Sequence, residues 1–276
     1  MACPNRLFVA YKPAGIASNR FLSRIKHRYG VKKAGFSGTL DPFAQGTLIV
    51  AFGQYTKLFR FLNKAPKRYR ATLWLGAQSD TLDIEAVRSI QSCPPLSMER
   101  IHKVCRTLEG EQRYLPPRYS AKKIGGRRAY TLARREEAFE LDAITSRIYA
   151  LRPIHYLHPF LTFEITIDEG GYVRSIAQMI AEALGCTGAL SALERLSEGA
   201  FVYEHERSLD PLAYLRLPPN RYLGDYEDIK VGRKLSTERF ACRDAGEYSL
   251  VLDNMLTIVE LSSSGVSYLL NGLKLC

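Results

Sequence analysis

An early, glycine-punctuated stretch of the chain reads Gly38-Thr39-Leu40-Asp41-Pro42-Phe43-Ala44-Gln45-Gly46-Thr47-Leu48. Its glycines, with Gly35 just before them, predict a structured loop. The short apolar run at 47–52 follows directly and predicts a buried strand. We therefore expect Asp41 to lie on a loop that leads into the core.

The charge around Asp41 is one-sided. Residues 1–79 contain 14 Lys and Arg side chains, and Asp41 is their single carboxylate. Neighbouring cations favour the ionised form of such a group, and an ionised, positioned carboxylate can act as a nucleophile or a base. An Asp followed by Pro also suits a helix N-cap with Pro at the first helical position. The residues alone leave both interpretations open.

Positive charge is concentrated in the first two-thirds of the chain. The net charge is +11, from 39 Lys+Arg and 28 Asp+Glu. Residues 113–135 contain eight Lys and Arg side chains and no acid, whereas residues 201–276 contain nine against eleven acids, a net of −2. This block structure favours a polyphosphate partner bound by the N-terminal two-thirds; a solvated basic surface is the alternative.

Periodicity predicts alternating strands and helices. We expect strands at 7–11, 47–52, 67–76, 144–151, 160–167, 200–203, 248–252 and 256–261. We expect helices at 18–29 with Ser18 as N-cap, 54–63, from Ser97, from Val173 to a stop at Gly185, and at 188–196.

Two segments between these elements have a different character. Residues 113–135 are basic and interrupted by Pro116-Pro117 and Gly125-Gly126, which predicts an excursion that is mobile without its ligand. The run 217–220 contains two prolines and predicts a linker before a small β-rich appendage.

Several classes of protein are disfavoured. The longest clear apolar run, at 48–52, is far short of the roughly 20 residues that a bilayer requires. No apolar stretch follows the N-terminal cations, so we expect a cytoplasmic protein without a secretory signal. The six cysteines form no CxxC pair and are expected to be reduced. The pairs His102/Cys105 and His155/His158 lack partner pairs, so no metal site is expected.

Five motifs in order resemble the TruB family of tRNA pseudouridine synthases. The stretch at 38–48 resembles the family's GTLDPLATGVL loop, although Gln45 stands where threonine is common. The other four are Lys12-Pro13-Ala14-Gly15, Lys67-Arg68-Tyr69, Pro116-Pro117-Arg118-Tyr119-Ser120-Ala121-Lys122-Lys123 and Gly171-Tyr172-Val173-Arg174. They resemble the KPxG turn, the strand with the base-stacking tyrosine, the PPxYSAxK stretch and the GTYIR motif. The likeness covers about residues 7–203.

The resemblance implies a fold and a division of the chain. The fold class is α+β, with a mixed, largely antiparallel sheet flanked by helices and loops. Residues 1–205 would form the catalytic domain, with an RNA-clasping insertion at 113–140. Residues 206–220 would be a linker, and 221–276 a short PUA-like domain.

The resemblance also implies site residues. Asp41 would be the catalytic carboxylate, Tyr69 would stack on the uracil, and Arg174 would orient Asp41. The implied substrate-binding residues are Lys12, Phe36, Tyr119, Lys122, Tyr172 and Leu193. Many family members carry histidine where this chain has Phe36, and an apolar ring there can only wedge and stack as a base leaves the helix.

The implied reaction is isomerisation of uridine to pseudouridine in the T-arm of tRNA, at position 55, after base flipping. It needs no cofactor, and the expected protein is a monomer. A tRNA-folding chaperone role independent of catalysis is one alternative. A glycoside hydrolase is another, but that chemistry uses two carboxylates, and residues 1–79 hold one. The sequence leaves open whether Asp41 attacks the ribose, attacks the uracil or abstracts a ribose proton.

Overall fold

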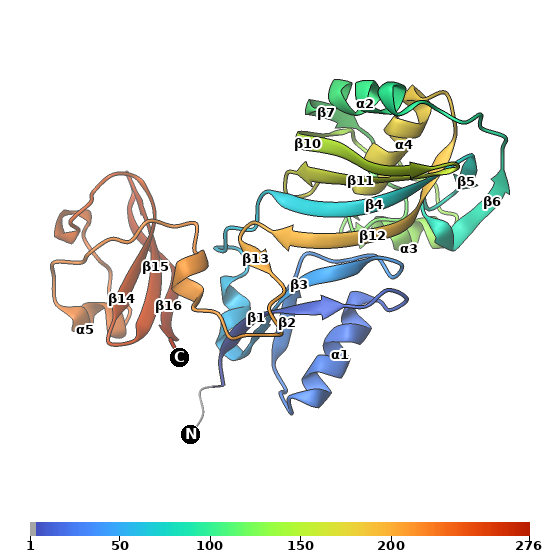
Figure 1. The fold of residues 1–276 in the computed structure, drawn as a ribbon. Helices are drawn as coiled ribbons and strands as arrows, with labels where there is room; N and C mark the ends of the chain where they lie inside the picture. The colour runs from blue at the N-terminus through green and yellow to red at the C-terminus, as the bar shows by residue number, and fades with distance from the viewer. Residues whose placement is uncertain (1–3) are drawn as a thin grey trace.

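The computed structural model describes residues 4–276, which form two β-sheets of different size with helices against the larger one (Figure 1). The larger sheet has nine strands, with the order β1-β3-β12-β4-β11-β10-β7, β2 on β3 and β13 on β12. Its pairs are antiparallel except for β3 with β12. The predicted α+β class with a mixed, largely antiparallel sheet is confirmed.

The elements have the following bounds. The strands of the larger sheet are β1 (Arg6–Lys12), β2 (Ala34–Ser37), β3 (Gln45–Phe52), β4 (Lys67–Leu75), β7 (Gly110–Tyr114), β10 (Ile144–Leu157), β11 (Phe160–Ile167), β12 (Gly188–Glu198) and β13 (Phe201–Val202). Two hairpins are formed by β5 (Ala77–Ser79) with β6 (Val87–Ile90), and β8 (Lys123–Ile124) with β9 (Arg127–Arg128). The smaller sheet contains β14 (Gly246–Leu252), β15 (Met255–Ser262) and β16 (Gly265–Lys274). The α-helices are α1 (Ser18–Arg28), α2 (Met98–Thr107), α3 (Ala129–Arg134), α4 (Val173–Ala183) and α5 (Tyr226–Lys230).

Strand β4 shows how sequence alternation sets the main core. Its residues alternate strictly between buried and more exposed positions, so Tyr69, Ala71 and Leu73 all face inward. Helix α4 covers that face through Ile176 and Ile180, and α2 packs beside it. The strands expected at 67–76, 144–151 and 160–167 are confirmed, as are the helices from Ser97 and Val173.

Strands β1 and β3 are buried on both faces. On one face Phe8 and Val50 pack with Ile25 of α1. On the other, Leu7 and Ile49 pack with residues of the smaller sheet. This double burial explains the continuous apolar run that predicted a strand at 47–52.

The segment 188–196, expected to be a helix, is a strand. Its Ala, Leu and Glu residues favour a helix in isolation, but β12 lies between β3 and β4 and bonds to both. The pairing places Leu190 and Leu193 in the main core. Tertiary pairing therefore overrides the local preference.

Two further helix predictions need correction. The segment 54–63 contains the end of a short 3₁₀-helix, Gly53–Leu58, followed by turns that bury Phe61 and Leu62. Ser18 is not the N-cap of α1; Ala17 occupies that position without a side-chain cap. The Ser18 hydroxyl bonds instead to the backbone of Leu40.

The basic segment 113–135 has its own anchors. It contains the β8–β9 hairpin and α3, whose Ala129, Leu132 and Ala133 are buried. The buried side chains of α3 therefore anchor the end of this segment, whereas the hairpin at 123–128 is largely exposed.

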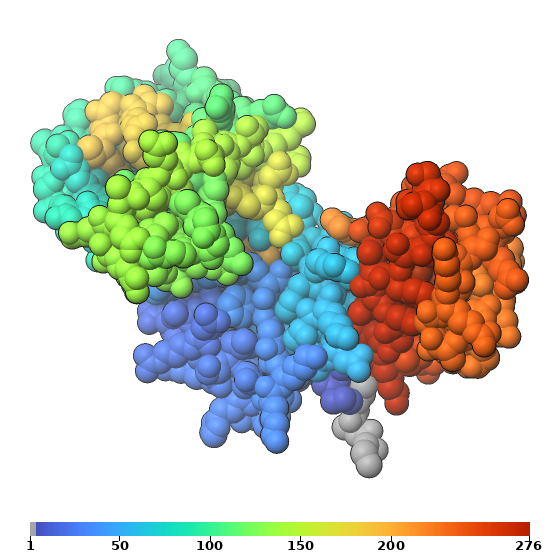
Figure 2. Space-filling view, turned by 180° about the vertical axis from the view of Figure 1, so that it is seen from behind, coloured from blue at the N-terminus to red at the C-terminus, as the bar shows by residue number. Residues whose placement is uncertain are grey.

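The smaller sheet forms a separate lobe beside the main one (Figure 2). It has a core of its own that includes Tyr222, Phe240 and Tyr248. The segment 206–220 is packed rather than loose, because it forms the turn Pro211–Tyr214 and Leu209 N bonds to Leu7 O at 2.8 Å. A β-rich C-terminal part is thus present, in contact with the first strands of the chain.

The expectation that all cysteines are reduced is wrong for Cys93 and Cys186. Cys93 and Cys186 form a disulfide, with Cα atoms 5.9 Å apart, while Cys105 and Cys242 are free thiols. The bond joins the segment after β6 to the turn between α4 and β12. Cys3 lies outside the described residues. Within residues 4–276, every helix is too short or too polar to span a bilayer.

Candidate active site

The segment that carries Asp41, residues 38–47, comprises the loop after β2 and the first three residues of β3; we call it the Asp41 loop. Both neighbours of Asp41 are tied down. Leu40 O accepts from the Ser18 hydroxyl at 2.9 Å, and Leu40 N donates back to it at 3.0 Å. Pro42 O accepts from Gly15 N at 2.8 Å. Asp41 begins no helix, so the N-cap interpretation is wrong.

The Lys12 side chain is hydrogen-bonded to the same loop. Its side chain is fully buried, and the ammonium donates to Ile16 O at 2.7 Å, Pro13 O at 3.0 Å and Pro42 O at 3.3 Å. An ammonium has three hydrogens, so these three carbonyls use its whole donor capacity. Burial lowers the pKa of Lys12 to about 8. In this structure Lys12 joins the KPxG-like turn to the Asp41 loop.

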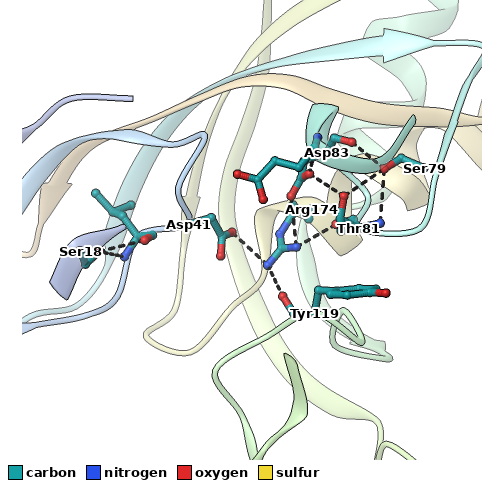
Figure 3. A network of polar contacts seen from close by, with 9 residues as sticks. Ser18, Asp41, Ser79, Thr81, Asp83, Tyr119 and Arg174 are labelled. Atoms are coloured by element: carbon teal, nitrogen blue, oxygen red, sulfur yellow. Dashed lines mark hydrogen bonds and ion pairs between the residues drawn. The ribbon is translucent and has the colours of Figure 1, made fainter. Parts of the chain in front are cut away.

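Arg174 lies at the centre of the site (Figure 3). Its Nη2 is 3.0 Å from Asp41 Oδ2, and its Nη1 is 3.3 Å from Asp83 Oδ2. The guanidinium also donates to Thr81 O at 2.8 Å and to Tyr119 O at 2.9 Å. A planar guanidinium held at four points cannot rotate freely, so it fixes the orientation of the Asp41 carboxylate.

Asp83 is the second carboxylate of this network and is almost fully buried. Its Oδ1 accepts from the Thr81 hydroxyl at 2.6 Å and from Glu85 N at 3.0 Å. Leu82, between these two residues, has a positive φ of 61°, which a side chain other than glycine rarely adopts. The strained turn directs both Thr81 O and the Asp83 carboxylate at Arg174, and such strain is typical of functional sites.

Opposing effects act on the Asp41 carboxyl, whose side chain is 32% exposed. Burial raises its pKa above the ordinary value, and Asp83 acts in the same direction. The cations of Arg174, Lys12 and Arg195 oppose this by favouring the carboxylate. The sequence-based expectation counted the cations but not the burial or the second acid.

Two cavities meet at Asp41. The smaller, about 280 Å³, is lined by Asp41, Tyr69, Tyr172, Arg174 and Leu193, among others. The larger, about 510 Å³, lies on the side of α1 and the insertion. Its walls include Asp83, Glu85, Tyr119, Arg128, Tyr130 and Arg134. We call them the Tyr69 cavity and the Tyr119 cavity.

The expected site residues thus fall into groups. The three expected catalytic residues meet at the Tyr69 cavity with Tyr172 and Leu193, while Tyr119 lines the other cavity. Phe36 and Lys122 line neither. Phe36 packs on the core between α1 and β3, and Lys122 Nζ donates to Asp142 O at 3.1 Å.

Sequence reasoning missed Asp83. It lies 91 residues from Arg174 along the chain, outside the range 1–79 in which acids were counted. The structure places it and Glu85 near Asp41, so the argument that only one acid is available is also wrong. The one local signal is the run Asp80-Thr81-Leu82-Asp83, whose two acids follow a long acid-free region.

Among residues 4–276, no group of three or more His, Cys, Asp or Glu side chains is arranged to hold a metal ion.

Two solved structures have a similar fold. A Cbf5-Nop10-Gar1 complex matches with a TM-score of 0.69 and 18% identity, covering 98% of this chain and 84% of the other. An H/ACA RNP bound to a substrate RNA containing 2′-deoxyuridine matches with a TM-score of 0.65, also at 18% identity, covering 98% and 84% of the two chains. At this identity the likeness establishes the fold alone.

Sequence comparison identifies the family. A protein of a Nitratiruptor species named tRNA pseudouridine synthase B is 54% identical over 97% of both chains. One of the same name from Campylobacter curvus is 48% identical over 99% of this chain and 100% of its own. Residues 26–173 match the model for the TruB family pseudouridylate synthase, N-terminal domain. With the Asp41 loop, Tyr69 and Arg174 assembled around one cavity, this chain belongs to the TruB family of pseudouridylate synthases.

Proposed function

We propose that this protein isomerises uridine 55 in the T-arm of tRNA to pseudouridine, with Asp41 as the catalytic carboxylate. The observation that carries the proposal is the ion pair of Arg174 with Asp41 at the wall of the Tyr69 cavity. The names of the relatives point to tRNA as the substrate.

The reaction breaks the bond from ribose C1′ to uracil N1 and forms one from C1′ to C5. A proton leaves C5 and one is gained at N1, so atoms and electrons balance without an oxidant or a cofactor. Asp41 is the group that can attack the ribose, attack the uracil or take a ribose proton, and Arg174 holds it in position.

The Tyr69 cavity is the proposed site of the target base. Tyr69 is 7% exposed at the inner face of β4, and Leu193 offers an apolar surface on the neighbouring β12. An aromatic ring and an apolar side chain can sandwich a flipped pyrimidine, which replaces part of the stacking lost on extrusion. Tyr172, at the N-terminus of α4, completes the wall.

The basic insertion at 113–140 is the proposed RNA clasp. Arg128 and Arg134 of this segment line the Tyr119 cavity and lie on the same side of Asp41 as α1. Phosphate contacts from such side chains supply binding energy that offsets base flipping. We also propose a monomer, and a domain division at 206–220, because the residues that follow this segment have a core of their own.

The direct test is to incubate the purified protein with a tRNA transcript and map pseudouridine by chemical probing and primer extension. We expect modification at position 55 alone, without added metal or cofactor. A transcript with cytidine at position 55 is the matched control and should remain unmodified. Modification elsewhere would refute the site assignment, and its absence would refute the activity.

A further inference from the structure

A second buried charge cluster lies under the ends of the Asp41 loop, away from Arg174. It consists of Lys67, Arg195 and Glu198, which are 6%, 2% and 0% exposed. Glu198 lies between the two cations, with Oε1 3.0 Å from Arg195 Nη2 and Oε2 3.1 Å from Lys67 Nζ. Neither contact has hydrogen-bond geometry, so charge holds the carboxylate in place.

Arg195 joins the two ends of the Asp41 loop. Its Nη2 donates to Gly38 O at 2.8 Å, and its Nε donates to Thr47 O at 2.8 Å. The Thr47 hydroxyl in turn donates to Leu196 O at 2.9 Å. One planar side chain therefore closes the loop where it leaves β2 and where it enters β3.

Glycines allow the loop to sit directly on the cluster. At Gly38, where φ is +68°, an added Cβ would lie 2.8 Å from Glu198 Oε2 and 3.2 Å from Lys67 Nζ. At Gly46, where φ is +109°, it would lie 2.3 Å from Arg195 O. Both ends of the loop therefore require glycine for backbone angle and for space.

The cluster also connects the loop to the strand of Tyr69. Lys67 begins β4 and lies two residues before Tyr69, so both side chains belong to the same face of the strand. Lys67 and Arg195 both line the Tyr69 cavity. The distance between the Asp41 loop and Tyr69 thus depends on how these charges pack.

We propose that Lys67, Arg195 and Glu198 are positioning residues for the reaction, with Arg195 as the clasp that sets the Asp41 loop against Tyr69. This inference rests on the proposed function. Stability alone is a weak explanation for the cluster, because replacing buried ions by apolar side chains of similar volume is often neutral or stabilising. A role in positioning explains why the Arg195 guanidinium donates to the carbonyls of both Gly38 and Thr47.

Arg195→Lys is the informative variant. It keeps the charge, but one ammonium cannot reproduce a guanidinium fork that spans both carbonyls. We expect the single-turnover rate of pseudouridine formation to fall by about 10- to 100-fold, as a small misplacement of a catalytic group allows. The Kd for tRNA should stay within about twofold, since the side chain is buried. The acid limb of the pH profile should not move, because the cation that favours ionised Asp41 remains.

Val9→Ala is the matched control. It truncates a buried side chain of β1 outside the cluster, and both variants are compared well below their melting temperatures. A rate for Arg195→Lys within twofold of this control would overturn the inference. Absence of product with the unaltered protein would instead refute the proposed function, so the two failures are distinguishable.

Glu198→Gln decides the case if Arg195→Lys does not fold. The amide keeps the volume but leaves Lys67 and Arg195 to repel each other, which should draw the fork away from the loop. We expect a fall in rate of at least about fivefold with unchanged tRNA affinity, a coupling of the size found for contacting residues. A folded Glu198→Gln protein with an unchanged rate would overturn the inference.

Discussion

At the scale of single residues, burial and neighbouring cations act in opposite directions on the pKa of Asp41. Burial raises the pKa of Asp41, while Arg174 favours the carboxylate from 3.0 Å away. A carboxyl whose folded-state pKa exceeds its unfolded value costs stability at neutral pH, since ionisation is less favourable in the fold. The ionised Asp41 carboxylate therefore lowers the free energy of unfolding, which is expected where a charge is used in catalysis.

Asp41→Asn tests whether the charge of Asp41 is needed for catalysis or only for the structure of the loop. The amide keeps the shape but cannot carry the charge, so pseudouridine formation should fall below detection. Binding of tRNA should stay similar or tighten, because a negative charge near phosphates is gone. The melting temperature should be no lower than that of the unaltered protein, since the removed charge has a raised pKa. Near-normal turnover by this variant would sink the assignment of Asp41.

Asp83→Asn tests the second carboxylate. Loss of its charge weakens the restraint on Arg174, so we expect the single-turnover rate at pH 7 to fall by about tenfold or more, a typical effect of losing one charged partner. Asp83 also raises the pKa of Asp41, so the acid limb of the rate profile should move to lower pH in the variant.

Asp80→Asn is the control for that experiment, because Asp80 lies in the same hairpin and pairs with the exposed Arg88. It should leave both the rate and the acid limb unchanged. An acid limb that moves to higher pH in Asp83→Asn would contradict the electrostatic account.

Sequence could single out Asp41 as a candidate because its isolation among cations is visible along the chain, whereas its catalytic role was implied only by the resemblance to the TruB family. It could not identify Asp83, Arg195 or Glu198, whose roles arise from contacts across strands. Arg195, for example, meets Gly38 only because β12 lies parallel to β3. Lys12 shows the converse: its motif was recognised, but only the structure shows three carbonyls around its ammonium.

At the scale of elements, local patterns predicted β4, a strand with one buried face, better than β12 and the segment 54–63, whose burial depends on contacts with distant parts of the chain. Strand β4 follows a period of two and was predicted with nearly its true ends. Strand β12 was predicted as a helix because its composition favours one, and its two neighbouring strands come from distant parts of the chain. Segment 54–63 failed for a related reason, since Phe61 and Leu62 are buried by tertiary contacts and not along one helix face.

The insertion gives a prediction at this scale. Its hairpin at 123–128 is mostly exposed, whereas α3 is anchored by Leu132 and Arg174 binds Tyr119 O. On addition of tRNA, amide hydrogen exchange should slow mainly in the hairpin, with smaller changes in α3. Unchanged exchange throughout 113–140 would count against an RNA clasp. Exchange in the C-terminal sheet serves as the internal reference.

At the scale of the whole molecule, charge is distributed unevenly between the two lobes. The net charge of +11 arises from the N-terminal two-thirds, because residues 201–276 carry a net of −2. The main lobe is therefore the side that attracts a polyanion.

Binding of tRNA should therefore depend steeply on salt. With several phosphate contacts, affinity should fall by about 10³-fold or more between about 50 and 200 mM salt, because each neutralised phosphate releases counterions. The slope of log Kd against log salt measures this. A truncated T-arm stem-loop should show a smaller slope if fewer phosphates are engaged. A flat response with full tRNA would remove the electrostatic argument.

The contact between the first and last strands has a consequence for how the chain is made. Leu7 and Val9 of β1 share a core with Leu256 and Leu273, and Asn5 donates to Lys274 O at 3.0 Å. During synthesis, β1 leaves the ribosome with one face that stays without these partners until almost the whole chain has been translated. Such an exposed apolar face favours aggregation of the nascent chain until β15 and β16 are made.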